Sequence, residues 1–172
     1  MATSTQRPQV ESFFDEGSNT FTHLVRDPQS RQCAIIDPVL DFDYPAGHTS
    51  TRSADALLAH IEAESLEVAW ILETHVHADH LSAATYLKGK LDCQLAIGAR
   101  IREVQDIFAD IFAAEAGFAR DGRQFDRSPE EGDSLAIGGL ECRVLHTPGH
   151  TPACISYVIG DAVFVGDTLF MP

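Results

Sequence analysis

The sequence of 172 residues lacks any apolar run that approaches the length needed to span a bilayer. Its first residues, Met1 to Glu11, are polar and contain no hydrophobic stretch typical of a signal peptide. The sequence therefore predicts a cytoplasmic protein with no membrane partner.

Basic residues are scarce. Lys and Arg total 12 against 26 Asp and Glu, which gives a net charge of -14. A field of this sign repels nucleic-acid phosphates and anionic lipid surfaces, so we expect no nucleic-acid partner. Solubility alone explains most of these carboxylates.

Cysteine is also sparse, and none of the four forms a CxxC pair. Widely spaced cysteines are typical of buried apolar positions rather than of a disulfide framework. One of them lies close to the metal motifs described below, so a role for it stays open. The four are Cys33, Cys93, Cys142 and Cys154.

The apolar content of 44% is enough for a hydrophobic core, and the length suits one domain. No repeat and no linker divides the chain, so the sequence predicts a single domain over residues 1–172. The first third has the pattern of a β meander, followed by a polar segment, 41–51, that predicts a loop. The predicted strands are 10–14, 20–26 and 32–37.

Two helices are predicted from the periodicity of apolar residues. Ser53 is the expected N-cap of the first. The second covers roughly 101–112, and its period predicts that Phe108 and Phe112 lie in the core. The segment 117–132 predicts a loop, and the last forty residues predict two hairpins, with turns at 138–139 and 160–161.

Histidine and aspartate crowd into residues 74–80, between an apolar run that predicts a strand (68–72) and a segment that predicts a helix (81–87). In an extended or turn segment, residues two apart face the same way, so these side chains can converge. Neutral imidazoles suit zinc, iron and copper, and a carboxylate balances the charge. The alternative is a polar turn whose histidines only cap the helix. The four side chains are His75, His77, Asp79 and His80.

Two later segments each follow a predicted strand. In the first, Pro148 and Gly149 force a tight bend from which His150 projects. In the second, Asp167 stands at a strand end after Gly166. Each motif alone is common. The order HxHxDH, then PGH about seventy residues on, then GD within twenty more residues, is a specific constellation.

These motifs together resemble the metallo-β-lactamase superfamily, and the resemblance covers nearly the whole chain. It implies an α/β fold, the αββα sandwich, here apparently without its C-terminal portion, and a metal at one edge of the two sheets. In dinuclear members, the positions of His75, His77 and His150 form one site. Asp79 and His80 would help to form the second site, and Asp167 would bridge the two.

Within the superfamily, the motifs look most similar to persulfide dioxygenases. Ala78 is small, where glyoxalase II proteins usually carry a bulky aromatic residue. In persulfide dioxygenases, one Fe(II) is held at the positions that match His75, His150 and Asp167. This is a two-histidine, one-carboxylate set whose open positions admit a sulfur and O₂. The remaining groups of the cluster would then orient ligands and bound water.

The resemblance implies an iron-dependent enzyme that oxidises glutathione persulfide to sulfite and glutathione. A zinc-dependent thioester hydrolase of the glyoxalase II type is the alternative, with Asp79 orienting or deprotonating the attacking water. A non-catalytic metal-binding or sulfur-sensing module is a third reading. By this resemblance, the expected partner is a small thiol or persulfide substrate based on glutathione, and a homodimer is compatible with the sequence.

Two histidines stay outside the predicted site: His23, in the middle of a strand, and His146. Superfamily members normally continue past the Gly-Asp segment and supply a further metal-site histidine and the glutathione contacts there. This sequence ends at Pro172, directly after the apolar segment 168–171. We therefore expect a longer natural protein, whose following residues cover that sheet edge and close the pocket.

Overall fold

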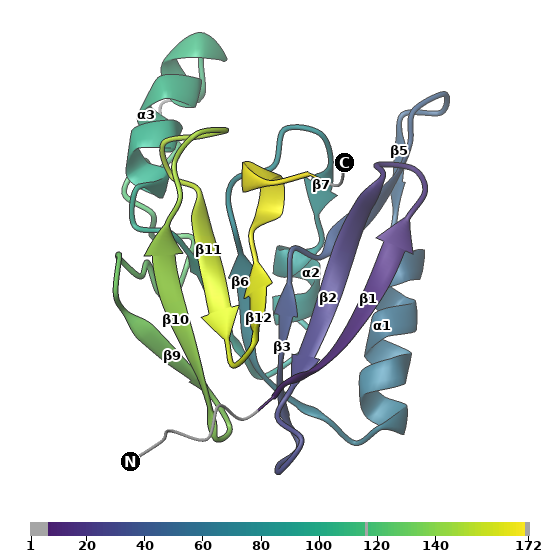
Figure 1. The fold of residues 1–172 in the computed structure, drawn as a ribbon. Helices are drawn as coiled ribbons and strands as arrows, with labels where there is room; N and C mark the ends of the chain where they lie inside the picture. The colour runs from purple at the N-terminus through teal and green to yellow at the C-terminus, as the bar shows by residue number, and fades with distance from the viewer. Residues whose placement is uncertain (1–6, 116, 171–172) are drawn as a thin grey trace.

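The computed structural model describes residues 7–115 and 117–170. The expectations for residues 1–6, Met171 and Pro172 lie outside these ranges. Two β-sheets pack face to face, and helices lie against the first of them (Figure 1). The predicted α/β sandwich is therefore confirmed.

The first sheet has the strand order β1-β2-β3-β6-β8. The first three strands form the predicted antiparallel meander, whereas β3, β6 and β8 run parallel. Helices α1 (Arg52–Ala63) and α2 (Ala84–Lys88) bury apolar side chains on the outer face of this sheet. The strands are β1 (Gln9–Asp15), β2 (Thr20–Arg26), β3 (Gln32–Ile36), β6 (Glu67–Glu73) and β8 (Gln94–Ile97).

The second sheet has the order β12-β11-β10-β9, and both predicted hairpins are confirmed. Gly138 and Gly160 adopt φ angles of 60° and 59° in the two turns, which favour residues without a Cβ. Alternate residues of this sheet face the first sheet and form the main core with it. The strands are β9 (Ser134–Ile137), β10 (Leu140–His146), β11 (Ile155–Ile159) and β12 (Ala162–Phe164).

The prediction of a loop over 41–51 is wrong. The segment contains the end of β4 (Val39–Asp43) and β5 (His48–Ser50), which form a small sheet with β7 (Leu81–Ser82). The predicted helix start at residue 81 is also wrong. Val39 pairs with Ser82, so the chain stays extended there, and α2 begins only at Ala84. A short hairpin between β4 and β5 thus replaces the predicted loop, and a long-range pairing with β4 overrides the local pattern at residues 81–82.

Ser53 is not the N-cap of α1, because the helix begins at Arg52 and Thr51 occupies the cap position, without a capping hydrogen bond from its side chain to the helix backbone. The carboxylate of Asp41 performs the capping role instead. It accepts the backbone N–H of Ser53 at 2.9 Å and the hydroxyl of Ser53 at 2.7 Å. An acidic group at this place also interacts favourably with the helix dipole.

Helix α3 (Ile101–Ile111) forms as predicted, but its last turn is not core. Phe112 is 73% exposed and Phe108 is 36% exposed. The buried side of the helix consists of Ile101, Val104, Gln105 and Ala109. The end of α3 projects beyond the sheets (Figure 1), so no sheet surface is available to cover its aromatic side chains.

All four cysteines are free. Three of them are buried, as predicted, whereas Cys93 is only half-buried. Burial raises the pKa of the Cys33 and Cys142 thiols to about 12, so both are unreactive packing residues. Among the described residues, no helix combines the length and the apolar character required to cross a membrane.

Candidate metal centre

Three segments meet at one edge of the sandwich, at the upper edge in Figure 1. They are the turn after β6, the loop between β10 and β11, and the short 3-10 turn η1 (Gly166–Thr168) after β12. Each follows the carboxyl end of a strand, and the sheet packing brings these ends together. The three motifs that are far apart in the sequence therefore become neighbours.

His75, His150 and Asp167 form the first cluster, in which one ligand atom from each residue lies within 4.8 Å of the others. Oδ2 of Asp167 is 3.5 Å from Nε2 of His150 and 3.9 Å from Nε2 of His75. His75 is buried, whereas His150 and Asp167 are partly open to solvent. Two imidazoles and one carboxylate thus converge with an accessible side.

The tautomer of His75 follows from its hydrogen bonds. Thr74 donates its hydroxyl proton to Oδ2 of Asp37 at 2.8 Å, and the hydroxyl oxygen of Thr74 lies 2.9 Å from Nδ1 of His75. Because the hydroxyl proton is committed to Asp37, Nδ1 of His75 must be the donor to Thr74. The lone pair of His75 is therefore on Nε2.

Nε2 of His75 is buried and has no hydrogen-bond partner among the described residues. Burial, the largest influence, and the neighbouring His77 lower the pKa of His75 to about 4, so the ring is neutral at pH 7. A buried, neutral nitrogen without a partner is costly unless a ligand satisfies it. A metal ion fits this atom.

Gly166 allows η1 to approach the turn after β6. Its φ angle is 50°, in the left-handed region, and a Cβ at this position would come within 2.3 Å of Oγ1 of Thr74. Only glycine therefore permits the backbone before Asp167 to lie against Thr74 and His75. This contact sets where the carboxylate of Asp167 enters the cluster.

His77, a predicted metal ligand, does not join the first cluster. Its Nε2 lies 2.8 Å from Oε2 of Glu73 and 3.3 Å from Oδ1 of Asp37, and all three side chains are nearly buried. Burial acts to lower the pKa of His77, but the bonds to Asp37 and Glu73 prevail and raise it to about 11. Hydrogen bonds from His77 and Thr74 outweigh burial at Asp37 and lower its pKa to about 2.

Asp79 and His80, the predicted catalytic pair, form another cluster with His77, again within 4.8 Å. The rings of His77 and His80 stack with centroids 4.1 Å apart. Burial is the largest influence that lowers the pKa of His80. Tyr44 donates its hydroxyl to the backbone oxygen of Asp79 at 3.2 Å, which links the β4–β5 hairpin to this turn.

Asp37 and Glu73 are site residues that the sequence analysis missed. Ile36 of β3 pairs in parallel with Leu72 of β6, so the next residue of each strand stands at the same edge of the sheet. The available signal was an acidic residue directly after each of two apolar strands. It required the parallel pairing of those strands, which the sequence did not reveal.

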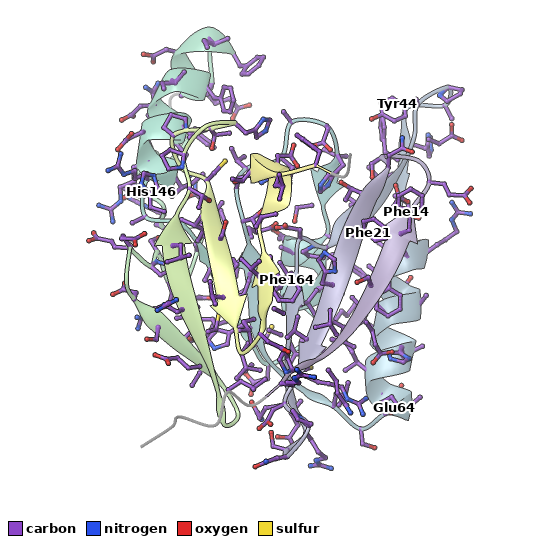
Figure 2. All side chains as sticks on the ribbon, viewed as in Figure 1. Phe14, Phe21, Tyr44, Glu64, His146 and Phe164 are labelled. Atoms are coloured by element: carbon purple, nitrogen blue, oxygen red, sulfur yellow. The ribbon has the colours of Figure 1, made fainter. Side chains whose placement is uncertain are left out.

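A groove of about 730 Å³ leads to the first cluster between β12 and the β1–β2 hairpin. Figure 2 shows Phe21 and Phe164 on its two sides. His23 lies in its wall, where Ser12 bonds its Nδ1 at 2.8 Å. Apolar walls around a polar floor are typical of small-molecule sites.

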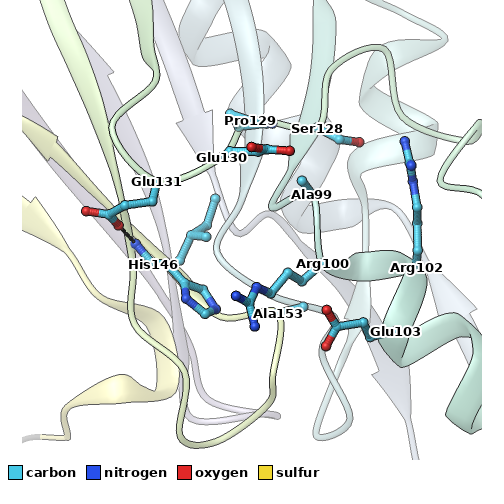
Figure 3. A pocket seen from close by; sticks show the side chains of 11 residues that line it. Ala99, Arg100, Arg102, Glu103, Ser128, Pro129, Glu130, Glu131, His146 and Ala153 are labelled. Atoms are coloured by element: carbon cyan, nitrogen blue, oxygen red, sulfur yellow. Dashed lines mark hydrogen bonds between the residues drawn. The ribbon is translucent and has the colours of Figure 1, made fainter.

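His146 lies elsewhere, in a separate cavity of about 480 Å³ beside α3 (Figure 3). Its Nε2 bonds the backbone oxygen of Pro152 at 2.9 Å, and its backbone N–H donates to Glu131. Two arginines and three glutamates line this cavity, so its charges largely balance. The structure does not bring His146 to either histidine cluster.

A fold of two facing sheets with histidines and aspartates clustered at one edge defines a metal-dependent protein. The family description "Metallo-beta-lactamase superfamily" matches residues 16–172. The chain belongs to this superfamily, as its motifs predicted.

Three relatives and one solved structure illustrate the likeness. A probable metallo-hydrolase of Burkholderia pseudomallei is 51% identical over 95% of this chain and 59% of its own length. A hydroxyacylglutathione hydrolase of Rhodopseudomonas palustris is 37% identical over 89% and 49%. Human mitochondrial persulfide dioxygenase ETHE1 is 32% identical over 94% and 53%. The crystal structure of ETHE1 from Myxococcus xanthus matches with a TM-score of 0.71 and 29% identity, over 95% of this chain and 59% of that one.

The chain thus spans between half and three-fifths of the length of these relatives. They support a metal-dependent enzyme, and their names divide between hydrolysis and sulfur oxidation.

Proposed function

We propose that the chain carries the catalytic centre of an iron-dependent persulfide dioxygenase acting on a glutathione-based persulfide. One Fe(II) would be held by His75, His150 and Asp167. The observation that carries this proposal is Nε2 of the buried, neutral His75, which has no hydrogen-bond partner within residues 7–115 and 117–170 and lies 3.9 Å from Oδ2 of Asp167. Two imidazoles and one carboxylate with open positions are the donor set of non-haem iron oxygenases.

The iron would supply the electron transfer and the open positions at which the persulfide sulfur and O₂ are brought together. In the balanced reaction, the terminal sulfur gains two oxygen atoms from O₂ and one from water, and sulfite and glutathione are released. The similarity to human and M. xanthus ETHE1 supports this reaction class.

The residues of the chain would bind the metal, orient its ligands and the substrate, and shield the site from water. The relay from Asp37 through Thr74 to His75 holds the ring and keeps its lone pair on Nε2. Asp79 and His80 cluster with His77, whose ring centroid is 4.3 Å from that of His75, and there they would orient water or the substrate thiol. The apolar walls of the groove, including Phe21 and Phe164, limit the access of water.

A zinc-dependent thioester hydrolase is the second candidate, supported by the 37% identity to hydroxyacylglutathione hydrolase. The cluster of His77, Asp79 and His80 favours it, because a second metal could bind beside the first. Zinc would lower the pKa of bound water to about 7 and so generate the attacking hydroxide.

Two assays on one batch of metal-free protein, loaded with either iron or zinc, distinguish the dioxygenase from the hydrolase. Protein loaded anaerobically with Fe(II) is expected to consume O₂ and release sulfite when glutathione persulfide is added. Zinc-loaded protein is expected to leave the thioester S-lactoylglutathione intact. Thioester hydrolysis with zinc, and no O₂ uptake with iron, would replace the dioxygenase by the hydrolase. Metal binding without either activity would indicate a sensing or binding module.

A further inference from the structure

Glu73 makes two contacts that no motif accounts for. It is the last residue of β6 and is 3% exposed. Oε2 lies 2.8 Å from Nε2 of His77, and Oε1 accepts the hydroxyl of Ser82 on β7. Both oxygens of a buried carboxylate are therefore occupied by groups from the metal-binding turn and from its far end.

The neighbouring acid, Asp37, contacts His77 less closely than Glu73 does. Its Oδ1 accepts the backbone N–H of Thr74 at 2.8 Å, and its Oδ2 accepts the hydroxyl of Thr74 at 2.8 Å. Nε2 of His77 lies farther from Asp37, at 3.3 Å, than from Glu73, at 2.8 Å. Asp37 thus also holds the His75 side of the turn, and Glu73 is the nearer partner of His77.

A ring nitrogen that donates a hydrogen bond to a carboxylate carries a proton and has no lone pair for a metal. With Nε2 held in this way, Nδ1 is the one ring nitrogen of His77 that can face Asp79 and His80. Partners of this kind fix the tautomer and orientation of imidazoles at metal centres, and their loss weakens metal binding by 10–100-fold.

We infer that Glu73 is a positioning residue of the metal centre: it holds Nε2 of His77 and thereby decides which ring nitrogen His77 presents to the site. The inference rests on the proposed metal centre, but not on whether the reaction is oxidation or hydrolysis. The bond to Ser82 adds a second effect, because it ties the two ends of the turn, residues 73 and 82, together.

The first test uses the unmodified protein without metal. Nitrogen-15 NMR of the histidine rings is expected to show the Nε2 proton of His77 held in a hydrogen bond, whether or not Nδ1 also carries a proton. Glu73→Gln keeps the size but removes the charge, and is expected to shift the His77 ring signals. Unchanged signals in Glu73→Gln, or Nδ1 as the hydrogen-bonded nitrogen in the unmodified protein, would overturn the inference.

The second test measures Zn(II) affinity by competition with a chelating dye. Glu73→Gln is expected to bind zinc 10–100-fold more weakly, and Ser82→Ala is expected to lose less, because it leaves the contact with His77 in place. Glu67→Gln is the matched control, since Glu67 lies on the same strand and pairs with Arg31 at the surface. Equal losses in Ser82→Ala and Glu73→Gln would show that Glu73 acts only by closing the turn, which contradicts the inference.

The two proposals can fail separately. If neither zinc nor iron binds to the unmodified protein, the metal centre is refuted. The NMR spectra of the metal-free protein would still test the hydrogen bond between Glu73 and His77. Normal metal binding without O₂ consumption would refute the dioxygenase and leave the role of Glu73 standing.

Discussion

Gly166 lies against Thr74 so closely that a Cβ on the glycine would come within 2.3 Å of the threonine hydroxyl oxygen. This contact joins the third motif to the first, although 91 residues lie between Thr74 and Gly166 in the sequence. It places Asp167 beside His75 and leaves the hydrogen bond between Thr74 and Asp37 intact. The geometry of the candidate metal centre therefore depends on backbone packing as well as on its ligands.

Replacing Gly166 by Ala is expected to destabilise the protein and to lower its metal affinity. The left-handed φ angle alone costs an L-residue about 1–2 kcal/mol, and the clash with Thr74 adds to this. Thermal unfolding and zinc titration measure the two effects. Gly117→Ala is the control, because nothing lies within 4 Å of a Cβ there. Wild-type stability and affinity in Gly166→Ala would contradict the assigned contact.

Single Ala replacements of His75, His150 and Asp167 are each expected to remove most of the bound metal, because a three-residue site leaves no spare ligand. Inductively coupled plasma mass spectrometry of the purified variants measures the metal content per chain. His48→Ala is the control, since His48 is exposed on β5. Full metal content in His150→Ala would refute the assignment of the ligands.

Thr74→Val is expected to weaken metal binding by about 10–100-fold, the usual effect of losing an outer partner of a ligand. Valine keeps the shape of threonine but breaks the relay that links Asp37 to Nδ1 of His75. The buried carboxylate also loses one donor, which costs about 1–3 kcal/mol of stability. Thr49→Val, at an exposed position of β5, should change neither quantity. An unaltered zinc affinity in Thr74→Val would exclude the relay.

The metal-free protein is expected to lose stability as the pH falls from about 6.5 to about 4. Burial lowers the pKa of His75 from 6.5 to about 4 in the folded state, so in this window the unfolded chain binds a proton that the folded chain does not. The contribution of this one group is present above pH 6.5, and it declines by at most about 1.4 kcal/mol per pH unit. Unfolding midpoints of the protein and of His75→Asn across this range measure the difference. Parallel pH profiles would show that His75 is not responsible.

The contribution of His77 to the stability of the metal-free protein changes with pH in the opposite direction to that of His75. The bonds to Asp37 and Glu73 overcome burial and raise its pKa from 6.5 to about 11, so its stabilising charge is fully present below pH 6.5 and is lost as the pH rises toward 11. Denaturant unfolding of metal-free protein between pH 7 and pH 10 is expected to show falling stability, and His77→Gln should reduce the slope. A slope that His77→Gln does not change would contradict the charged state of His77.

The sequence predicted most of the strands well and the segments that connect them less well. The three motifs each follow an apolar strand, and the structure has His75, His150 and Asp167 in the segments just after β6, β10 and β12. The segment 81–83 was misassigned, because Val39 and Leu40 pair with Ser82 and Leu81 across a distance that no local pattern encodes. The segment 41–51 was misassigned, because its polar residues form a short hairpin in which Asp41 pairs with Ser50. Phe108 and Phe112 have a helical period, but the period does not say how far the helix extends past the sheets.

The sequence by itself determined the superfamily, the α/β sandwich and the candidate metal ligands, because these depend on residue types and on their order along the chain. Only the tertiary structure decided that His77 turns its Nε2 toward Glu73 and Asp37, while Nε2 of His75 has no hydrogen-bond partner among the residues that the structure describes. That difference arises from the parallel pairing of β3 with β6, which sets two acidic side chains at one sheet edge. Hydrogen bonds across such a pairing join residues distant in sequence, so they exist only once the sheet has formed.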